Sequence, residues 1–191
     1  MEIKNPYLEL FNKYEMSNSI WQNNNFKDRP ERFAIIRKFS FAVPTNECAE
    51  AIKEYTTEIV EIGCGSGYWA WFLAQHDITV HAYDKYDIEK NSYNFSKEHF
   101  PFKIGNKNSI KKHPEAALFL CWPDYDESVA VNILKKYKGK YFFYVGETQY
   151  GCCADDEFFE YLNENFEEKK IVRIPQHWGI HDAFYVYKKR K

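Results

Sequence analysis

The chain has 191 residues, of which 45% are hydrophobic and 28% charged, and its formal net charge is −2. This length favours one well-buried domain over two of ordinary size, and the composition is typical of a globular protein. Because affinity for phosphate backbones comes from clustered Lys and Arg, the balanced charge argues against nucleic acid as a partner. The basic run at residues 188–191 is best interpreted as a solvated end.

The cysteines form an odd set of five without a C-x-x-C spacing, which disfavours a secreted disulfide framework. They are Cys48, Cys64, Cys121, Cys152 and Cys153. The first residues carry charges instead of the apolar core of a signal peptide, and no apolar run approaches membrane-spanning length. We therefore expect a cytoplasmic protein without a membrane partner, and the sequence leaves its oligomeric state open.

Residues 1–55 are predicted to form an N-terminal helical extension. Apolar residues recur at helical spacing after Pro6, which suits the first turn of a helix. A polar, asparagine-rich segment at residues 18–29 is predicted to be a loop or lid around Trp21 and Phe26. Further helices are expected after Pro30 and after Thr45, a plausible N-cap. The extension either caps a substrate pocket or covers one face of a sheet.

The most informative stretch runs from Glu58 to Asp84. A β-branched run ends in three closely spaced glycines, an amphipathic helix follows, and a second β-branched run ends in an acid. A strand that turns at once into a helix, with a ligand against its backbone, leaves no room for Cβ atoms. Asp84, at the carboxyl end of the second strand, is placed to accept both hydroxyls of a ribose. The stretch predicts an adenosine-containing ligand.

The spacing of the glycines separates the adenosine ligands. Dinucleotide folds use G-x-G-x-x-G, and Tyr68 occupies the position of that last glycine, which disfavours an NAD- or FAD-dependent oxidoreductase. The sequence instead reads Gly63-x-Gly65-x-Gly67 after Glu61, and it resembles motif I of class I S-adenosylmethionine-dependent methyltransferases. The resemblance implies that S-adenosyl-L-methionine is the cofactor.

From residue 59 onward strands and helices alternate, which indicates an α/β fold with a mostly parallel sheet. Further strands are predicted at residues 102–104, 116–121, 141–145, 169–174 and 183–187. A weak helix is expected at residues 91–99, another after Asp126 with an apolar face from Val129 to Tyr137, and a third from Asp155 to Phe166. The last connection is too short for a crossover helix, so the last strand should be antiparallel.

The resemblance extends over about residues 56–191, the Rossmann-like core, and includes Leu120-Cys-Trp-Pro123 and Tyr144-Val-Gly-Glu147. This pattern is similar to a small methyltransferase-like family. It implies a seven-stranded sheet of order 3-2-1-4-5-7-6 within a single domain of residues 1–191. The implied cofactor site contains the loop residues Glu61, Gly63, Cys64, Gly65, Gly67 and Tyr68, then Asp84 for the ribose, Asn108 for the adenine edge, and Cys121 and Trp122.

Trp122-Pro-Asp-Tyr125 follows the fourth strand, where amino-methyltransferases carry Asn-Pro-Pro-Tyr. Pro123 and Tyr125 match that motif, but Trp122 offers no acceptor for an amine. Either Asp124 supplies the missing oxygen, or Trp122 and Tyr125 form an aromatic cage. A third interpretation is a proline-fixed turn with Trp122 packed on the adenine.

The predicted catalytic residues are Pro123, Asp124, Tyr125 and Glu147, with His181 a further candidate base. Methyl transfer mainly requires alignment of donor and acceptor, and a base helps only when the nucleophile arrives protonated. His177 and His181 have ligand-like spacing, but Gly179 lies between them and no third ligand is evident, so no metal site is expected.

We therefore expect a methyltransferase that acts on an unidentified small-molecule or protein acceptor, with an amine as one candidate. The alternative is a non-catalytic module that binds S-adenosylmethionine or a nucleoside on the same fold.

Overall fold

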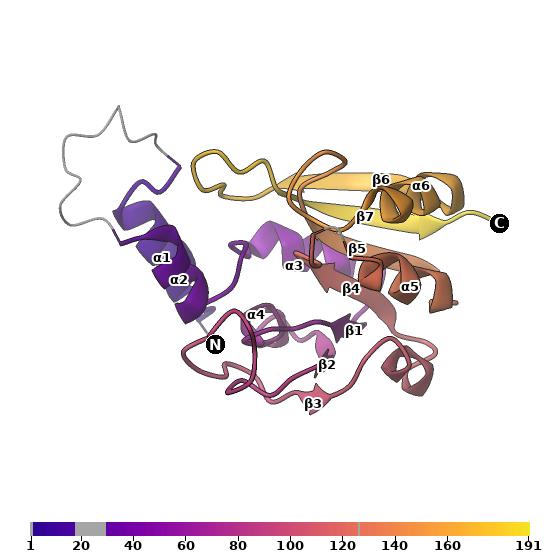
Figure 1. The fold of residues 1–191 in the computed structure, drawn as a ribbon, viewed down its shortest axis with the longest axis horizontal. Coiled ribbons are helices and arrows are strands. Elements are labelled where there is room, and N and C mark those ends of the chain that lie inside the picture. Colours follow the sequence, from indigo (N-terminus) through magenta and orange to yellow (C-terminus); the bar gives the residue numbers. More distant parts are fainter. Residues whose placement is uncertain (1, 18–29, 126) are drawn as a thin grey trace.

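The computed structural model describes residues 2–17, 30–125 and 127–191, which form a three-layered arrangement of helices around a sheet (Figure 1). The helices are α1 (Pro6–Lys13), α2 (Arg32–Lys38), α3 (Asn46–Lys53), α4 (Tyr68–Ala74), the 3-10 helix η3 (Ser109–Lys112), α5 (Val129–Lys136) and α6 (Asp156–Asn165). The strands are β1 (Glu58–Ile62), β2 (Thr79–Asp84), β3 (Lys103–Ile104), β4 (Ala117–Cys121), β5 (Tyr141–Gly146), β6 (Phe166–Arg173) and β7 (Ala183–Lys189).

The sheet has seven strands in the order β3-β2-β1-β4-β5-β7-β6, as the sequence predicts. Strands β1 to β5 pair in parallel, while β7 is antiparallel to both β5 and β6. The connection from β6 to β7 contains no helix, so the chain turns back beside the strand it has just left. The predicted antiparallel last strand is therefore confirmed.

Each face of the sheet has its own core. Side chains of α5 and α6 pack on one face around Val60, Leu118 and Phe142. Side chains of α3 and α4 pack on the other face around Ile59, Phe119 and Phe143. Successive strand residues point to opposite faces, so a strand covered on both sides must be apolar throughout. Strands β4 and β5 satisfy this requirement, because all but one residue of each is buried.

The N-terminal helices divide between two tasks. Helix α3 covers the sheet together with α4. Helices α1 and α2 lie beside each other on the left of Figure 1. Strand β7 points to the right there and is antiparallel to β5, so the parallel strands point to the left. Helices α1 and α2 therefore lie towards the carboxyl ends of the parallel strands. Tyr7, Phe39 and Val43 pack around Tyr68 at the start of α4. The interpretation as a cover therefore describes α3, while the interpretation as a cap of a substrate pocket stays a prediction for α1 and α2.

Local signals explain where several helices begin. The side chain of Asn5 accepts a hydrogen bond from the backbone N–H of Leu8 at 3.1 Å, and Pro6 occupies the first turn of α1. Asp155 accepts from the N–H of Phe158 at 2.8 Å at the start of α6. Thr45 is the N-cap residue of α3, as expected, although its side chain makes no capping bond there.

The predicted helix at residues 91–99 is wrong. The backbone N–H groups of Ser96 and His99 donate to the carbonyls of Arg37 and Ser66, at 2.7 and 2.8 Å, instead of to carbonyls one turn back. Asn91 closes a local turn by accepting from Tyr93 N–H at 2.9 Å, and Asn94 is left-handed with φ 55°. Tertiary hydrogen bonds thus outcompete a weak helical pattern.

Two smaller expectations also need correction. Phe166 belongs to β6, not to the buried face of α6, because α6 ends at Asn165 and the strand follows directly. Val129 is 47% exposed and does not join the buried face of α5. The predicted loop or lid at residues 18–29 and the cap at Asp126 lie outside the described residues, and Ser128 is the N-cap residue of α5.

All five cysteines are free thiols. In the described part of the chain, no helix combines the length and the apolar character needed to cross a membrane.

Candidate functional site

A cavity of about 470 Å³ opens at the carboxyl ends of β1, β2 and β4. Its walls include residues 63–66 of the glycine turn (residues 63–67), the end of β2, the turns after β3 and β4, and two further segments at residues 40–41 and 91–95. Ligands of doubly wound sheets bind at this edge, near the point where strand order reverses. In this sheet that point lies between β1 and β4, which are neighbours although β2 and β3 intervene in sequence.

The glycine turn has a backbone that only glycine adopts without strain. Gly63, Gly65 and Gly67 have φ angles of 81°, 57° and 72°. A Cβ at Gly65 would lie 2.8 Å from the ring of Phe95, and one at Gly67 would lie 2.9 Å from the carbonyl of Phe100. The turn is tied to β2, because the N–H groups of Gly63 and Cys64 both donate to Tyr83 O.

Asp84 links the two halves of the predicted cofactor site. Its Oδ2 accepts from Gly65 N–H at 2.8 Å, and its Oδ1 accepts from Tyr86 N–H at 3.1 Å. Burial raises the pKa of Asp84 above its usual value, although these backbone hydrogen bonds oppose the rise. Each carboxylate oxygen has more than one lone pair, so Asp84 can hold the turn and still accept from ribose hydroxyls.

Glu61 is the most unusual side chain of the cavity. It is 1% exposed, and its Oε2 has no hydrogen-bond partner. Desolvation, and secondarily the nearby charge of Asp84, raises its pKa to about 8. A buried carboxyl oxygen without a partner is costly, and a ligand in the cavity could satisfy it. A group that satisfies it would carry a positive charge or a hydrogen-bond donor.

Trp122 is held by several contacts after β4. Its φ is 48°, an uncommon value for a bulky residue. Its indole Nε1–H donates to Asp182 Oδ2 at 2.9 Å, and its ring stacks on Phe41 with the centroids 5.4 Å apart. Burial raises the pKa of Asp182 to about 6, and the indole hydrogen bond partly opposes this. Trp122 is thus a fixed wall of the cavity.

The expected cage of Trp122 and Tyr125 does not form, because Tyr125 is 66% exposed and lies outside the cavity lining. The aromatic partners of Trp122 come from elsewhere. Phe41 stacks on it, and Tyr93 meets Phe41 edge-on with centroids 4.9 Å apart. Phe41, Tyr93 and Trp122 are called the aromatic wall below. Beside it, the Tyr93 hydroxyl donates to Asp124 Oδ1.

Most of the predicted site residues do line this one cavity. They are Glu61, Gly63, Cys64, Gly65, Asp84, Asn108, Cys121, Trp122, Pro123 and Asp124. Among them, Asn108 already accepts a hydrogen bond from Lys136 Nζ at 2.9 Å, and its neighbour Asn106 lines the same wall. The assignment of the adenine edge to Asn108 stays a prediction.

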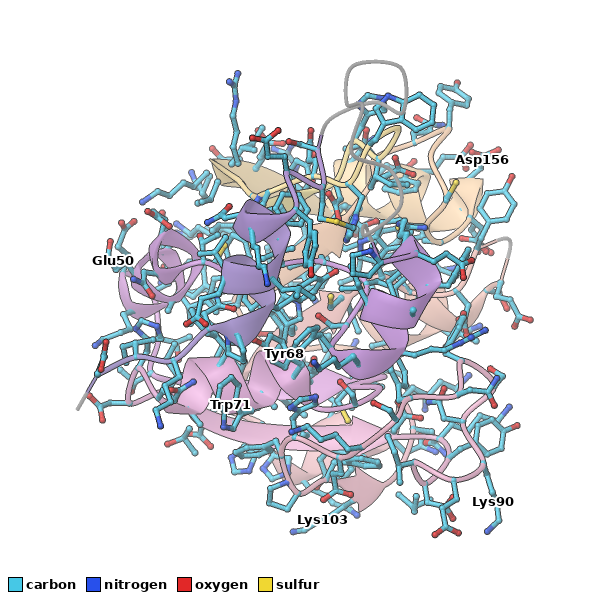
Figure 2. All side chains as sticks on the ribbon, turned by 90° about the vertical axis from the view of Figure 1, so that its left-hand side faces the viewer. Glu50, Tyr68, Trp71, Lys90, Lys103 and Asp156 are labelled. Carbon is cyan, nitrogen blue, oxygen red and sulfur yellow. The ribbon has the colours of Figure 1, made fainter. Side chains whose placement is uncertain are left out.

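Two loop residues lie outside the lining. The side chain of Tyr68 is turned towards the N-terminal helices (Figure 2), where its hydroxyl donates to Asn5 Oδ1 at 3.0 Å and accepts from Tyr7 N–H at 3.1 Å. Gly67 begins α4 and is packed against the backbone of Phe100. Both residues shape the turn from behind, so a direct cofactor contact by the Tyr68 side chain is a wrong expectation.

Glu147 is also outside the cavity lining, which corrects its proposed catalytic role. Its Oε2 accepts from Cys152 N–H and its Oε1 accepts from His181 N–H, both at 2.8 Å. This carboxylate is buried and holds two loops together. His177 likewise has a packing environment, because its Nε2 lies 2.9 Å from the Tyr7 hydroxyl and its ring meets Phe11 edge-on.

Sequence reasoning missed Phe41, Tyr93 and Phe95. They lie in segments without a recognisable motif, and the fold brings them to the glycine turn. One usable signal was present: aromatic residues alternate with polar ones in the stretch Asn91-Ser-Tyr-Asn-Phe95. Aromatic side chains in a polar loop a few residues after Asp84 are candidates for a ligand wall.

No family model and no curated protein matches this chain. Solved structures do resemble it. The N-methyltransferase NodS from Bradyrhizobium japonicum, in complex with S-adenosyl-homocysteine, is 11% identical with a TM-score of 0.53, over 98% of this chain and 100% of that chain.

Two further structures give the same result. A 1,6-didemethyltoxoflavin-N1-methyltransferase from Burkholderia thailandensis is 10% identical with a TM-score of 0.53, over 97% of this chain and 88% of that chain. TrmK of M. capricolum, with S-adenosyl-homocysteine, is 16% identical with a TM-score of 0.51, over 78% and 70% of the two chains. The chain therefore has the fold of the class I S-adenosylmethionine-dependent methyltransferases.

Proposed function

We propose that this protein is an S-adenosylmethionine-dependent methyltransferase, and that its acceptor is an amine on a small molecule or a protein. One observation carries the proposal: the buried Glu61 carboxylate beside the glycine turn, with an oxygen that has no partner. S-adenosylmethionine carries positive charge on its amino group and on its sulfonium. A dinucleotide would bring phosphates to this place, and negative charge next to Glu61 and Asp84 is unfavourable.

The residues of the cavity fit this cofactor. Glu61 would accept from the amino group of the methionine part, and the turn at Gly63 and Gly65 would let that part approach the backbone closely. Asp84 would accept from the ribose hydroxyls. The adenine would lie towards Asn108, in the turn after β3. The bound cofactor supplies a methyl group activated by the sulfonium.

The aromatic wall and Asp124 would position the acceptor. Methyl transfer is an in-line displacement, so the enzyme gains rate mainly by alignment. An amine reaches the cavity largely protonated and must lose a proton before it attacks. Asp124 lies in the cavity lining with Tyr93 bonded to one of its oxygens, so its other oxygen is placed to accept that proton.

One observation favours the alternative of a non-catalytic binding module. The Tyr93–Asp124 hydrogen bond already occupies one of the two oxygens of the proposed base and holds the carboxylate against Tyr93. If the bond persists when cofactor is bound, the protein would bind S-adenosylmethionine without transferring its methyl group.

A two-stage experiment tests the proposal. Thermal shifts are first measured with S-adenosylmethionine, S-adenosylhomocysteine, NAD and FAD, because a ligand that binds only the native state raises the melting temperature. We expect shifts with the first two ligands alone. Tritium is then followed from labelled S-adenosylmethionine into fractions of a cell extract, with Asp124→Asn as the matched variant. A shift with NAD or FAD alone would refute the cofactor assignment, while tight cofactor binding without label transfer would support the binding module.

A further inference from the structure

A second group of polar side chains lies away from the cavity, at the amino ends of the parallel strands. Glu58 is the first residue of β1, and His81 lies in the middle of β2. Glu58 and Val60 are two residues apart on β1, so their side chains face the same side of the sheet. Val60 pairs with His81 of β2, so His81 faces that side too. His113 follows η3, which contacts β1. These three residues are called the histidine cluster below.

The side chains of the histidine cluster converge. His81 Nε2 lies 2.7 Å from Glu58 Oε1, and the rings of His81 and His113 stack with centroids 3.7 Å apart. One ligand atom of each residue lies within 4.8 Å of the others. Within residues 2–17, 30–125 and 127–191, no other trio of His, Cys, Asp or Glu side chains converges in this way. The chain separations of 23 and 32 residues make such convergence a product of the fold.

The spacing is close to what a metal ion requires. Zinc binds imidazole nitrogen and carboxylate oxygen at about 2.0 to 2.2 Å, so two ligand atoms at a tetrahedral angle stand about 3.4 Å apart. The 2.7 Å between Glu58 Oε1 and His81 Nε2 is therefore slightly too short for two ligands of one ion. The rings of His81 and His113, which stack at an interplanar angle of 16°, are slightly too parallel to direct nitrogens at one ion. A small rotation of exposed side chains corrects both, since His81 is 28% and Glu58 44% exposed. That exposure also gives an ion a path from solvent.

The donor set indicates which ions would bind. Imidazole nitrogens with one carboxylate suit Zn²⁺, Co²⁺, Ni²⁺ and Cu²⁺, whereas Mg²⁺ and Ca²⁺ prefer oxygen ligands alone. An outer partner is present, because the Tyr83 hydroxyl lies 2.9 Å from His113 Nε2. Such a partner fixes the orientation of a ligating imidazole. Burial, His81 and, to a smaller extent, the charges of Lys103 and Lys112 lower the pKa of His113. The two lysines, of which Lys103 is labelled in Figure 2, would weaken cation binding.

We propose that Glu58, His81 and His113 bind one divalent transition-metal ion, with zinc as the type case, and that the remaining coordination positions are open to water. Three protein ligands plus water is the composition of an open zinc site. The ion would cross-link β1, β2 and the segment after η3. Because residues 105–108 directly precede η3 and line the cavity, the cross-link would also stiffen that wall.

The proposal is tested on the purified full chain after treatment with EDTA and exchange into chelator-free buffer. ZnCl₂ is titrated by calorimetry, CoCl₂ by its visible absorption, and MgCl₂ serves as the negative ion. We expect one saturable Zn²⁺ per chain, a higher melting temperature with zinc, and no effect of magnesium. His113→Ala and Glu58→Gln should each weaken zinc binding at least tenfold.

Two variants control for other zinc ligands. His76→Ala removes a half-buried histidine outside the cluster, and Cys152→Ser removes the exposed thiol; both should bind zinc as the wild type does. Circular dichroism checks that each variant is folded, and Glu58→Gln preserves shape if His113→Ala does not fold. Zinc binding that survives Glu58→Gln, or that disappears with Cys152→Ser, would overturn the assignment, as would the absence of saturable binding by the wild type.

Discussion

Strand β1 carries a glutamate near each end, and the two have opposite surroundings. Glu58, at the amino end, is half-exposed and lies against His81. Glu61, three residues later on the other face, is fully buried, and one of its oxygens has no partner. The same residue type thus makes a local pair at one end of the strand and a buried carboxyl with an unpartnered oxygen at the other.

The different surroundings of Glu58 and Glu61 indicate where the cofactor binds in this fold. At the amino end, Glu58 already has His81 and solvent as partners in the free protein. A buried carboxyl that finds none raises its pKa and depends on an outside group. The carboxyl end of β1 is therefore the place at which a positively charged ligand gains most binding free energy from a carboxyl group of this strand.

Gly65→Val should abolish cofactor binding, with an affinity loss of about a thousandfold or more. The branched side chain would need a strained φ of 57° and would collide with Phe95, which also lines the cavity. Calorimetry with S-adenosylmethionine measures the loss. Gly179→Val is the matched control, because Gly179 has φ 76° but nothing within 4 Å of its Cβ position. A folded Gly65→Val protein that binds like the wild type would show that the turn does not contact the cofactor.

Asp84→Ala should weaken S-adenosylmethionine binding by about 2 to 4 kcal/mol, because two charge-assisted hydrogen bonds are lost. Asp84 also holds Gly65 N–H and Tyr86 N–H, so part of this effect acts through the turn. Asp84→Asn separates the two contributions, since it keeps one oxygen acceptor. We expect it to retain more affinity than alanine in calorimetry. Unchanged affinity in folded Asp84→Ala would remove the ribose assignment.

Glu61→Gln should weaken cofactor binding about tenfold at pH 8 while stabilising the free protein. The folded pKa of Glu61 is raised from 4.5 to about 8, so the native state binds the proton more tightly than the unfolded state. The contribution of Glu61 to stability is therefore complete below pH 4.5 and is lost as the pH rises towards 8. The total change is about 2 to 5 kcal/mol.

Denaturant unfolding of the free protein between pH 5 and pH 8.5 measures this effect, and cofactor titrations over the same range measure affinity. Relative to Glu61→Gln, the wild type should lose stability and gain affinity as the pH rises. Glu115→Gln, which removes an exposed acid, should follow the wild type in both. Parallel curves for the wild type and Glu61→Gln would contradict the assigned role of Glu61.

Asp124→Asn should lower turnover by about tenfold with little change in cofactor affinity, and Tyr125→Ala should change neither. Asp124 lines the cavity, whereas Tyr125 is mostly exposed outside it. Single-turnover rates with an acceptor found by label transfer give the comparison. A large loss of turnover in Tyr125→Ala alone would restore the sequence-based interpretation that this tyrosine belongs to the acceptor site.

Prediction from sequence was accurate where chemistry is local. The strand that runs into Gly63 and the acid that ends β2 follow from residues that are neighbours in the chain, and both line the cavity. Prediction failed where a side chain could turn either way. Tyr68 and Tyr125 sit beside predicted site residues, yet one packs on the N-terminal helices and the other faces solvent.

The sequence by itself therefore determined the alternation of strands and helices, the glycine turn and the two carboxylates, because hydrophobic periodicity and backbone conformation depend on residues close in the chain. The strand order came from the family resemblance. Only the tertiary structure decided what surrounds the turn and the two carboxylates. Phe41 reaches Trp122, and His81 meets His113, across long separations in sequence. The reason is physical, because burial, ring stacking and the lack of a hydrogen-bond partner depend on which residues pack together. Glu58 and Glu61 differ in burial and in hydrogen-bond partners only once β2 and β4 have paired with β1.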